Sequence, residues 1–109
     1  MTLLLTKNWF PPDQGSKVAK RYVDWLKDHP PDKTIEKVFF IGVSSEENGM
    51  VLAFSVSDIM KGKEKEALES ATKQNLFMAA GIVGFKYKSE IVHNFPEAYK
   101  ILGLTAPEV

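Results

Sequence analysis

The residues best suited to acid–base chemistry in this sequence are its two histidines, His29 and His93. Imidazole changes its charge near neutral pH and can act as a general base. His29 precedes two prolines at the end of an amphipathic segment, where a histidine commonly interacts with the last carbonyls of a helix. His93 ends an alternating segment on the parity of Tyr87. It therefore either points into a covered sheet face as a base or hydrogen-bond donor, or caps the strand, and it is the catalytic candidate.

Other reactive groups are scarce. The sequence has no cysteine, which removes disulfides, thiolate nucleophiles and Cys-ligated metal sites. Neither histidine stands in a ligand spacing such as H-x-x-x-H, and no G-x-S-x-G motif of a serine hydrolase occurs. The glycines of GIVGFKYK, residues 81–88, enter a strand and not a helix, so they lack the helix N-terminus that binds phosphate. We expect no metal and no cofactor.

Two residues near the N-terminus are candidates for ligand binding. The indole of Trp9 combines a large flat area with one donor, which suits stacking on a flat ligand but equally suits a core or dimer contact. Asn8 and Thr6 have the opposite parity, and polar residues inside a strand are unexpected on a dry face. They either line a small polar pocket, or Asn8 caps the turn before the prolines that follow.

Composition limits the class of protein. The chain has 109 residues, 44% of them apolar and 26% charged, which is typical of one globular domain spanning residues 1–109. Lys plus Arg equals Asp plus Glu at 14 each, so no global positive field favours nucleic acid. The segment MTLLLTKNWF has no basic region or cleavage pattern of a signal peptide, and no stretch approaches about 18 apolar residues. We expect a cytoplasmic protein without a membrane span.

Periodicity predicts seven elements along the chain. These are a strand over 2–10 ended by prolines, a helix from Asp13 or Ser16 to HPP at 29–31, strands over 35–44 and 50–57, a helix over 62–78, a strand over 84–93, and a short helix opening at Asn94. The loop SEENG joins the second and third strands, and its Asn48-Gly49 supplies the positive φ angles of a hairpin. Glu97 completes a capping box with Asn94.

The sequence also predicts where two of the helices end and where one polar pair lies. Gly81 and Gly103 are expected to terminate the second and the last helix. Gln74 and Asn75 interrupt the apolar stripe of the second helix, and we expect them at the surface.

This βαββαβ order with a C-terminal helix is the ferredoxin-like order of an α+β fold. Right-handed crossovers place the antiparallel strands in the order 4-1-3-2, with the first two helices on one face. The end of the first strand then lies beside the beginnings of the third and fourth, so we expect Asn8 and Trp9 to neighbour Met50, Val51, Phe85 and Tyr87. His93 falls at the opposite end of the sheet, which disfavours a Trp9/His93 site unless a dimer brings the two ends together.

Both sheet faces contain apolar side chains. Strict alternation places Phe39, Ile41 and Val43 on one face of the second strand, and Leu52, Phe54 and Val56 on one face of the third. Covering three such side chains on the helix-free face would stabilise the protein by roughly 1.5 to 3 kcal/mol each. We therefore expect a covering partner, and a second copy of the chain is the simplest one.

These features resemble one family. A βαββαβ chain of this length, whose first strand ends in NWFPP and whose sheet has a second apolar face, resembles the dimeric α/β-barrel superfamily of ferredoxin-like proteins, in which two sheets pack face to face. The resemblance implies a homodimer. That superfamily includes cofactor-independent monooxygenases of polyketide-like aromatics, haem enzymes and small-molecule isomerases. None of their catalytic signatures matches this sequence residue by residue, so no catalytic residue is transferred.

Three functions remain open. The first is a homodimeric α/β-barrel protein that binds a small, mostly apolar organic ligand through Asn8, Trp9, Phe54 and Tyr87. The second is a cofactor-independent monooxygenase or isomerase of a small aromatic substrate, with His93 or Tyr87 transferring protons and Trp9 or Asn8 positioning the substrate. The third is a structural dimerisation domain without a ligand. A cavity of several hundred cubic Å lined by these residues would favour ligand binding.

Overall fold

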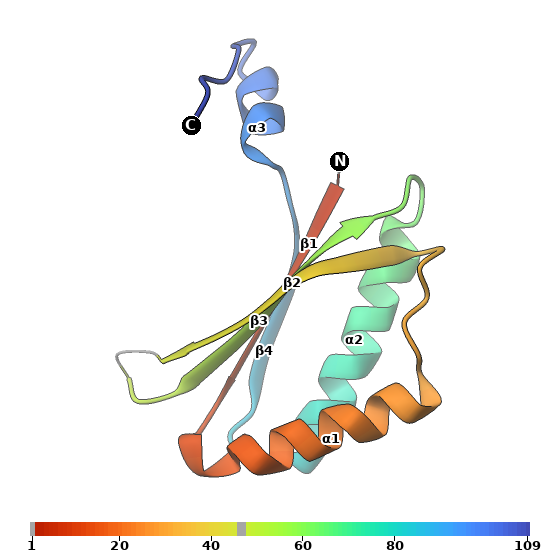
Figure 1. Cartoon of the computed structure of the whole chain (residues 1–109), viewed down its shortest axis with the longest axis vertical. Coiled ribbons are helices and arrows are strands. Elements are labelled where there is room, and N and C mark those ends of the chain that lie inside the picture. Colours follow the sequence, from red (N-terminus) through yellow and green to blue (C-terminus); the bar gives the residue numbers. More distant parts are fainter. Residues whose placement is uncertain (1, 46–47) are drawn as a thin grey trace.

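The computed structural model describes residues 2–45 and 48–109 (Figure 1). Glu46 and Glu47 of the predicted hairpin loop lie outside the described residues. The elements are β1 (Thr2–Phe10), a 3-10 helix η1 (Pro12–Gln14), α1 (Gly15–Asp28), β2 (Glu36–Ser45), β3 (Val51–Ile59), α2 (Glu64–Gly81), β4 (Lys86–Val92) and α3 (Phe95–Ile101). The predicted order of elements is confirmed.

The four strands form one antiparallel sheet in the order β2-β3-β1-β4. This is the predicted order 4-1-3-2 counted from the other edge. Figure 1 shows α1 and α2 on the same side of the sheet. We call that side the helix face and the opposite side the open face. The architecture confirms the ferredoxin-like fold.

Register assigns the strand residues to the two faces. Leu4 lies opposite Ser57 of β3 and Ile91 of β4, and it packs in the core with Ala67 of α2, so these positions belong to the helix face. Every second residue from them shares that face. The open face consists of Leu3, Leu5, Lys7 and Trp9 of β1, Leu52, Phe54, Val56 and Asp58 of β3, Lys86, Lys88, Glu90 and Val92 of β4, and Lys37, Phe39, Phe40, Gly42 and Ser44 of β2.

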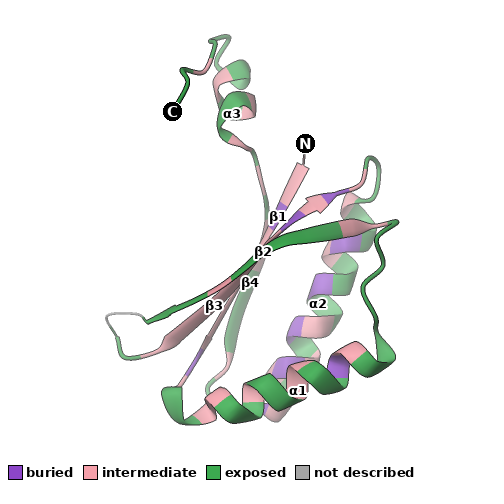
Figure 2. Cartoon of the chain, in the orientation of Figure 1, coloured by how far each residue is buried: buried purple, intermediate pink, exposed green. Residues whose placement is uncertain are grey.

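The core lies between α2 and the middle of the sheet. Leu4, Ile59, Ala67 and Ala71 form one cluster of buried side chains. Alanines at these helix positions let α2 approach β1 closely. Figure 2 shows the buried residues concentrated on α2 and the strands behind it, whereas β2 and α3 are mostly exposed. The second copy expected from the sequence would therefore cover apolar surface that this core leaves exposed.

Arg21 joins α1 to α2. Its Nε and Nη2 donate to the carbonyl of Phe77 at 2.8 and 2.5 Å, and its guanidinium carbon lies 3.9 Å from the centre of that ring. A Cβ at Gly81 would collide with the guanidinium. Gly81 is therefore needed for this contact, and its predicted role as a helix terminator is wrong: the helix is capped by Ile82, and the positive φ occurs at Gly84.

The start of α1 also differs from the prediction. η1 forms a tight turn after the prolines, with the amide of Gln14 donating to the carbonyl of Pro11 at 2.9 Å. Gln14 is the N-cap and makes no side-chain capping bond. The side-chain cap predicted at Asp13 or Ser16 is therefore wrong, because η1 directs the chain into the helix through its backbone.

The hairpin between β2 and β3 confirms one of its two turn residues. Gly49 has a φ of 81°. The Oδ1 of Asn48 accepts a hydrogen bond from the amide of Met50 at 3.0 Å. The asparagine therefore stabilises the turn through its side chain.

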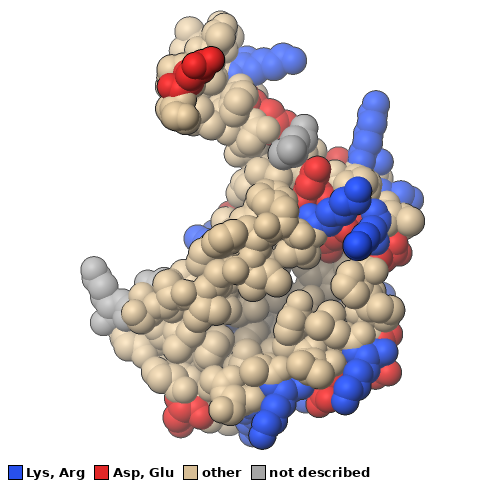
Figure 3. Space-filling model, viewed as in Figure 1, with Lys and Arg blue, Asp and Glu red and all other residues tan. Residues whose placement is uncertain are grey.

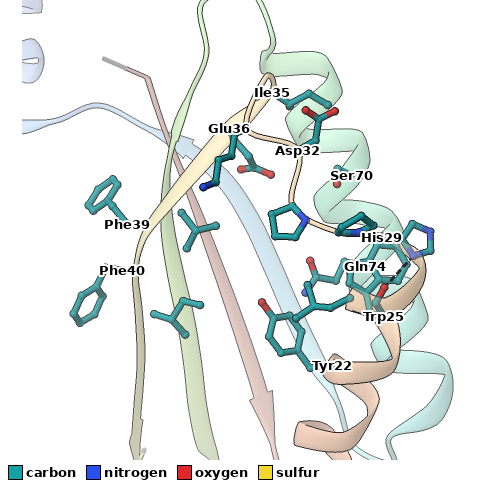
Figure 4. Close-up of a pocket in the computed structure, with 16 residues that line it drawn as sticks. Tyr22, Trp25, His29, Asp32, Ile35, Glu36, Phe39, Phe40, Ser70 and Gln74 are labelled. Carbon is teal, nitrogen blue, oxygen red and sulfur yellow. Dashed lines mark hydrogen bonds between the residues drawn. The ribbon is translucent and has the colours of Figure 1, made fainter.

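A bulge in β2 overturns the predicted alternation of that strand. The register shifts between Val38 and Phe40, leaving Phe39 as an extra residue. Phe39 and Phe40 both point to the open face (Figure 4), whereas Ile41 lies opposite Ser55 on the helix face. Phe39 and Ile41, expected on the same face, are on opposite faces.

The C-terminal helix has the predicted ends. Asn94 and Glu97 form a capping box. Gly103 has a φ of 74°, and the amides of Gly103 and Leu104 donate to the carbonyls of Lys100 and Tyr99 at 2.9 and 3.0 Å. This is the Schellman pattern of a glycine-terminated helix. In Figure 1, α3 lies on the side of the sheet opposite α1 and α2.

The chain is flat and extended for its length. Its radius of gyration is 15.5 Å, whereas a compact chain of this length would have a value of about 13 Å. Within residues 2–45 and 48–109, no helix combines the length and hydropathy needed to span a bilayer.

Candidate functional site

A cavity of about 540 Å³ lies between α1 and β2 (Figures 3 and 4). It exists because α1 packs chiefly against α2 and leaves the helix face of β2 uncovered. Val38 and Ile41 of that strand are 53% and 59% exposed and line the cavity. We call this cavity the α1–β2 groove.

The helical wall of the groove contains a stacked ring pair. The rings of Trp25 and His29 are parallel within 7°, with centroids 3.7 Å apart, and Trp25 also contacts Phe77 of α2. His29 Nδ1 lies 3.3 Å from the carbonyl of Trp25, to which the His29 amide donates at 2.9 Å. The predicted helix-end role of His29 is confirmed. The contacts hold both rings in place; Trp25 is only 8% exposed, whereas His29 is exposed.

The sheet wall is apolar except for one carboxylate. Ser57, which is buried, donates its hydroxyl to Glu36 Oε2 at 2.5 Å. This bond fixes a half-buried Glu36 beside Val38 and Ile41. The α2 side adds Gln74, so a ligand here would meet aromatic and aliphatic surface with a few polar groups.

A second carboxylate lies at the exposed rim of the groove. Asp32 Oδ1 accepts from the Thr34 hydroxyl at 2.6 Å and from the Thr34 amide at 3.0 Å. These hydrogen bonds, with a smaller contribution from the charge of Lys63, lower the pKa of Asp32 below its ordinary value of 3.8. Asp32 is therefore negative at neutral pH.

The four ligand-binding residues predicted from the sequence are divided between the two faces. Trp9 and Phe54 lie on the open face, whereas Asn8 and Tyr87 are opposite each other on the helix face. Trp9 and Tyr87 still line a common cavity of about 450 Å³ at the end of the sheet, together with Met50. Phe54 instead contacts the ring of Phe40. None of the four lines the α1–β2 groove.

Polar residues inside the sheet form a small network. The hydroxyls of Thr6 and Ser89 are 2.9 Å apart, and Asn75 Nδ2 donates to the same Ser89 oxygen at 2.9 Å. Asn75 is 3% exposed, so its predicted surface position is wrong. Asn8 Oδ1 is buried, and the described residues offer it no hydrogen-bond partner. A polar pocket at Asn8 remains a prediction.

His93 is far from the other predicted site residues. Trp9 lies opposite Lys86 at the start of β4, and Leu3 lies opposite Val92 at its end. His93 follows Val92 and is exposed. The predicted separation of Trp9 and His93 is confirmed.

Two lysines, Lys86 and Lys88, line the cavity beside Trp9. Lys7 lies directly opposite Lys88, and Lys86 lies opposite Trp9, all on the open face. Glu90 forms an ion pair with Lys88 at 3.5 Å. Three lysines and one glutamate make this end of the open face basic. Like charges opposite each other in a sheet are unfavourable. Among the residues that the structure describes, no group of three or more His, Asp or Glu side chains is arranged to hold a metal ion.

The sequence-based reasoning missed the residues that line the α1–β2 groove. Tyr22 and Trp25 belong to the apolar stripe of α1, and the sequence offers no sign that they line a cavity. Periodicity identifies the apolar side of a helix, but it does not show whether the opposing strand lies close enough to bury that side. The groove depends on how α1 crosses α2.

Comparison with solved structures supports the fold. The chain is similar to the de novo designed protein Foldit4, with a TM-score of 0.52, 9% identity, and coverage of 86% of this chain and 99% of that chain. It is similar to an antibiotic biosynthesis monooxygenase, with a TM-score of 0.50, 10% identity, and coverage of 88% and 100%. A putative antibiotic biosynthesis monooxygenase from Caulobacter crescentus gives a TM-score of 0.49, 14% identity, and coverage of 85% and 89%.

These similarities define the class of protein by its fold alone. The chain is a ferredoxin-like protein with a four-stranded antiparallel sheet. No protein-family model and no curated protein matches the sequence. Its function must therefore be argued from its own residues.

Proposed function

We propose that this chain is a homodimeric ferredoxin-like protein that binds a small, mostly apolar organic ligand in the α1–β2 groove. The main support is the groove itself. Its volume of about 540 Å³ falls within the range of roughly 300 to 1,000 Å³ found for small-molecule sites. The wall formed by the Trp25–His29 stack is flat and fixed at both rings.

The groove favours a particular ligand chemistry. Flat rings stack on aromatic side chains in offset or tilted arrangements, and Val38 and Ile41 provide aliphatic surface on the opposite wall. Glu36 can accept a hydrogen bond from a ligand hydroxyl or amine. With Asp32 negative at the rim, the favoured ligand is a neutral, planar compound with a donor group.

Homodimer formation is supported by the apolar residues of the open face. Phe39 and Phe40 are 59% and 52% exposed, and Leu52, Phe54 and Val56 are only half-buried. In this proposal Trp9 and Phe54 contribute to the dimer interface. Asn8 and Tyr87 belong to a second, smaller binding region on the helix face, and that region is a separate prediction from the groove.

A cofactor-independent monooxygenase or isomerase is the second candidate. The observation that favours it is the presence of an imidazole, a carboxylate and a phenol around one cavity, from His29, Glu36 and Tyr22. These groups can transfer protons to a bound aromatic substrate. His93 lies outside the groove, so its participation requires the second protomer.

The test is fluorescence titration with 2-naphthol, a neutral planar donor. Trp9→Phe leaves Trp25 as the single tryptophan, because the sequence contains two. We expect 2-naphthol to quench Trp25 with micromolar to millimolar affinity, and Ile41→Asp to weaken binding at least tenfold. Val43→Asp is the control, since Val43 shares the helix face of β2 but does not line the groove. Equal affinity of both variants would contradict a site in the groove.

A further inference from the structure

The C-terminal helix α3 exposes apolar side chains to solvent. None of its residues is buried, and Figure 2 shows it standing away from the rest of the chain. Phe95 is 45% exposed, and Leu102, the residue that caps the helix, is 73% exposed. Phe95, Ala98, Tyr99 and Leu102 recur at intervals of three and four residues, which places them on one side of the helix. We call these four residues the α3 stripe.

The sequence nevertheless specifies a helix here. The capping box closes its first turn, a glycine closes its last, and the rings of Phe95 and Tyr99 meet edge to face at 4.7 Å. An isolated helix of seven residues is unstable in water, because helices shorter than about 12 residues are marginal even with good formers. The α3 stripe therefore requires a surface to pack on.

The position of α3 indicates where that surface lies. α3 extends from the end of β4 on the side of the sheet opposite α1 and α2 (Figure 1). This is the side of the open face. A second copy that packs on the open face would therefore lie next to α3.

The apolar side chains of the open face support the same occupant. Phe39 and Phe40 are 59% and 52% exposed, and Leu52, Phe54 and Val56 are half-buried. A second copy that covers these side chains lies beside α3, because α3 begins at Phe95, three residues after β4 ends at Val92.

We propose that α3 is a clasp: its stripe packs on the second copy that covers the open face. The inference rests on the proposed homodimer and adds the segment that completes its interface. The charged side of α3, with Lys100, then faces solvent. A fold-back of α3 onto its own sheet is the alternative that the experiment must separate.

The experiment measures the dimer dissociation constant of the full chain by sedimentation equilibrium. Tyr99→Ser with Leu102→Ser removes most of the stripe, and Pro96→Ser with Lys100→Ser is the matched pair on the opposite side of the helix. We expect the stripe variant to raise the dissociation constant at least tenfold and the control to change it less than twofold. In the wild type, hydrogen exchange of the α3 amides should slow as the protein concentration rises through the dissociation constant.

The outcomes separate the clasp from the homodimer. A wild-type dimer whose dissociation constant is unchanged by the stripe variant would overturn the clasp and leave the homodimer standing. A wild type that stays monomeric at 100 µM, with α3 amides protected independently of concentration, would overturn both and indicate the fold-back. Circular dichroism of both variants checks that the ferredoxin-like body remains folded.

Discussion

The guanidinium of Arg21 in α1 lies 3.9 Å from the ring centre of Phe77 in α2 and donates two hydrogen bonds to the carbonyl of the same residue. This contact joins the two helices. α1 packs chiefly against α2 and leaves β2 uncovered, so the α1–β2 groove stays open.

Gly81→Ala tests this contact. The new Cβ would collide with the Arg21 guanidinium, so the side chain must move and lose its bonds to Phe77. Because the overlap is with the end of a flexible side chain, the cost is mainly that of the lost hydrogen bonds, and we expect a loss of about 0.5 to 1.5 kcal/mol in the free energy of unfolding, measured by urea denaturation. Gly15→Ala is the control: it also lies in a helix but has open space around it, and it should be neutral or stabilising by up to about 1 kcal/mol. Equal effects of the two substitutions would contradict the role of Gly81.

Asn75→Leu tests the buried network. The substitution removes the bond to Ser89 and places an apolar side chain beside two hydroxyls, so we expect a loss of about 1 to 3 kcal/mol in the free energy of unfolding. Combining it with Thr6→Val and Ser89→Ala removes every polar member of the network. The triple variant should be less destabilised than the sum of the single variants, because no polar partner is left unsatisfied. Additive losses would show that the three residues are not coupled.

Much of the fold could be predicted because its signals are local. The strand at 2–10 has the predicted bounds, since the prolines that follow it cannot join a ladder. The capping box at Asn94 and the helix end at Gly103 could also be predicted, because each is specified by residues next to it in the sequence. Each depends on residues within one turn.

The misses depend on contacts between distant segments. The bulge at Phe39 lies within the run VFFI, whose residues are all apolar, so alternation gives no sign of where one residue is skipped. Asn75 is buried because Ser89 and Thr6 lie across from it, and these partners belong to other elements. The α1–β2 groove depends on how α1 packs on α2, which includes the Arg21–Phe77 contact between residues 56 positions apart.

Thr34→Val tests the electrostatics of the groove rim. Hydrogen bonds from Thr34 lower the pKa of Asp32 in the folded protein below 3.8, and the substitution removes the hydroxyl bond. We expect the pKa of Asp32 to rise toward 3.8, as measured by NMR titration of its carboxyl carbon. A lowered folded-state pKa stabilises the protein above the unfolded-state value and loses this effect as pH falls through the folded-state value. The variant should therefore lose less stability than the wild type on acidification below pH 3.8. Thr72→Val, whose hydroxyl donates to the Leu68 carbonyl, should leave the titration unchanged.

A matched pair of valines tests which sheet face forms the proposed dimer. Val56 lies on the open face opposite Leu5 and Phe40, whereas Val43 lies on the helix face and is 69% exposed. A lysine at position 56 would place a charge within the proposed interface, where an unpaired buried charge is strongly unfavourable.

We expect Val56→Lys to be monomeric at 10 µM in sedimentation velocity and Val43→Lys to sediment like the wild-type dimer. Both positions are accessible in the single chain, so a lysine side chain can reach water in the monomer and the variants should remain folded. A dimer that survives Val56→Lys but dissociates in Val43→Lys would place the interface on the helix face. The α1–β2 groove would then lie between protomers, and its ligand would contact both chains.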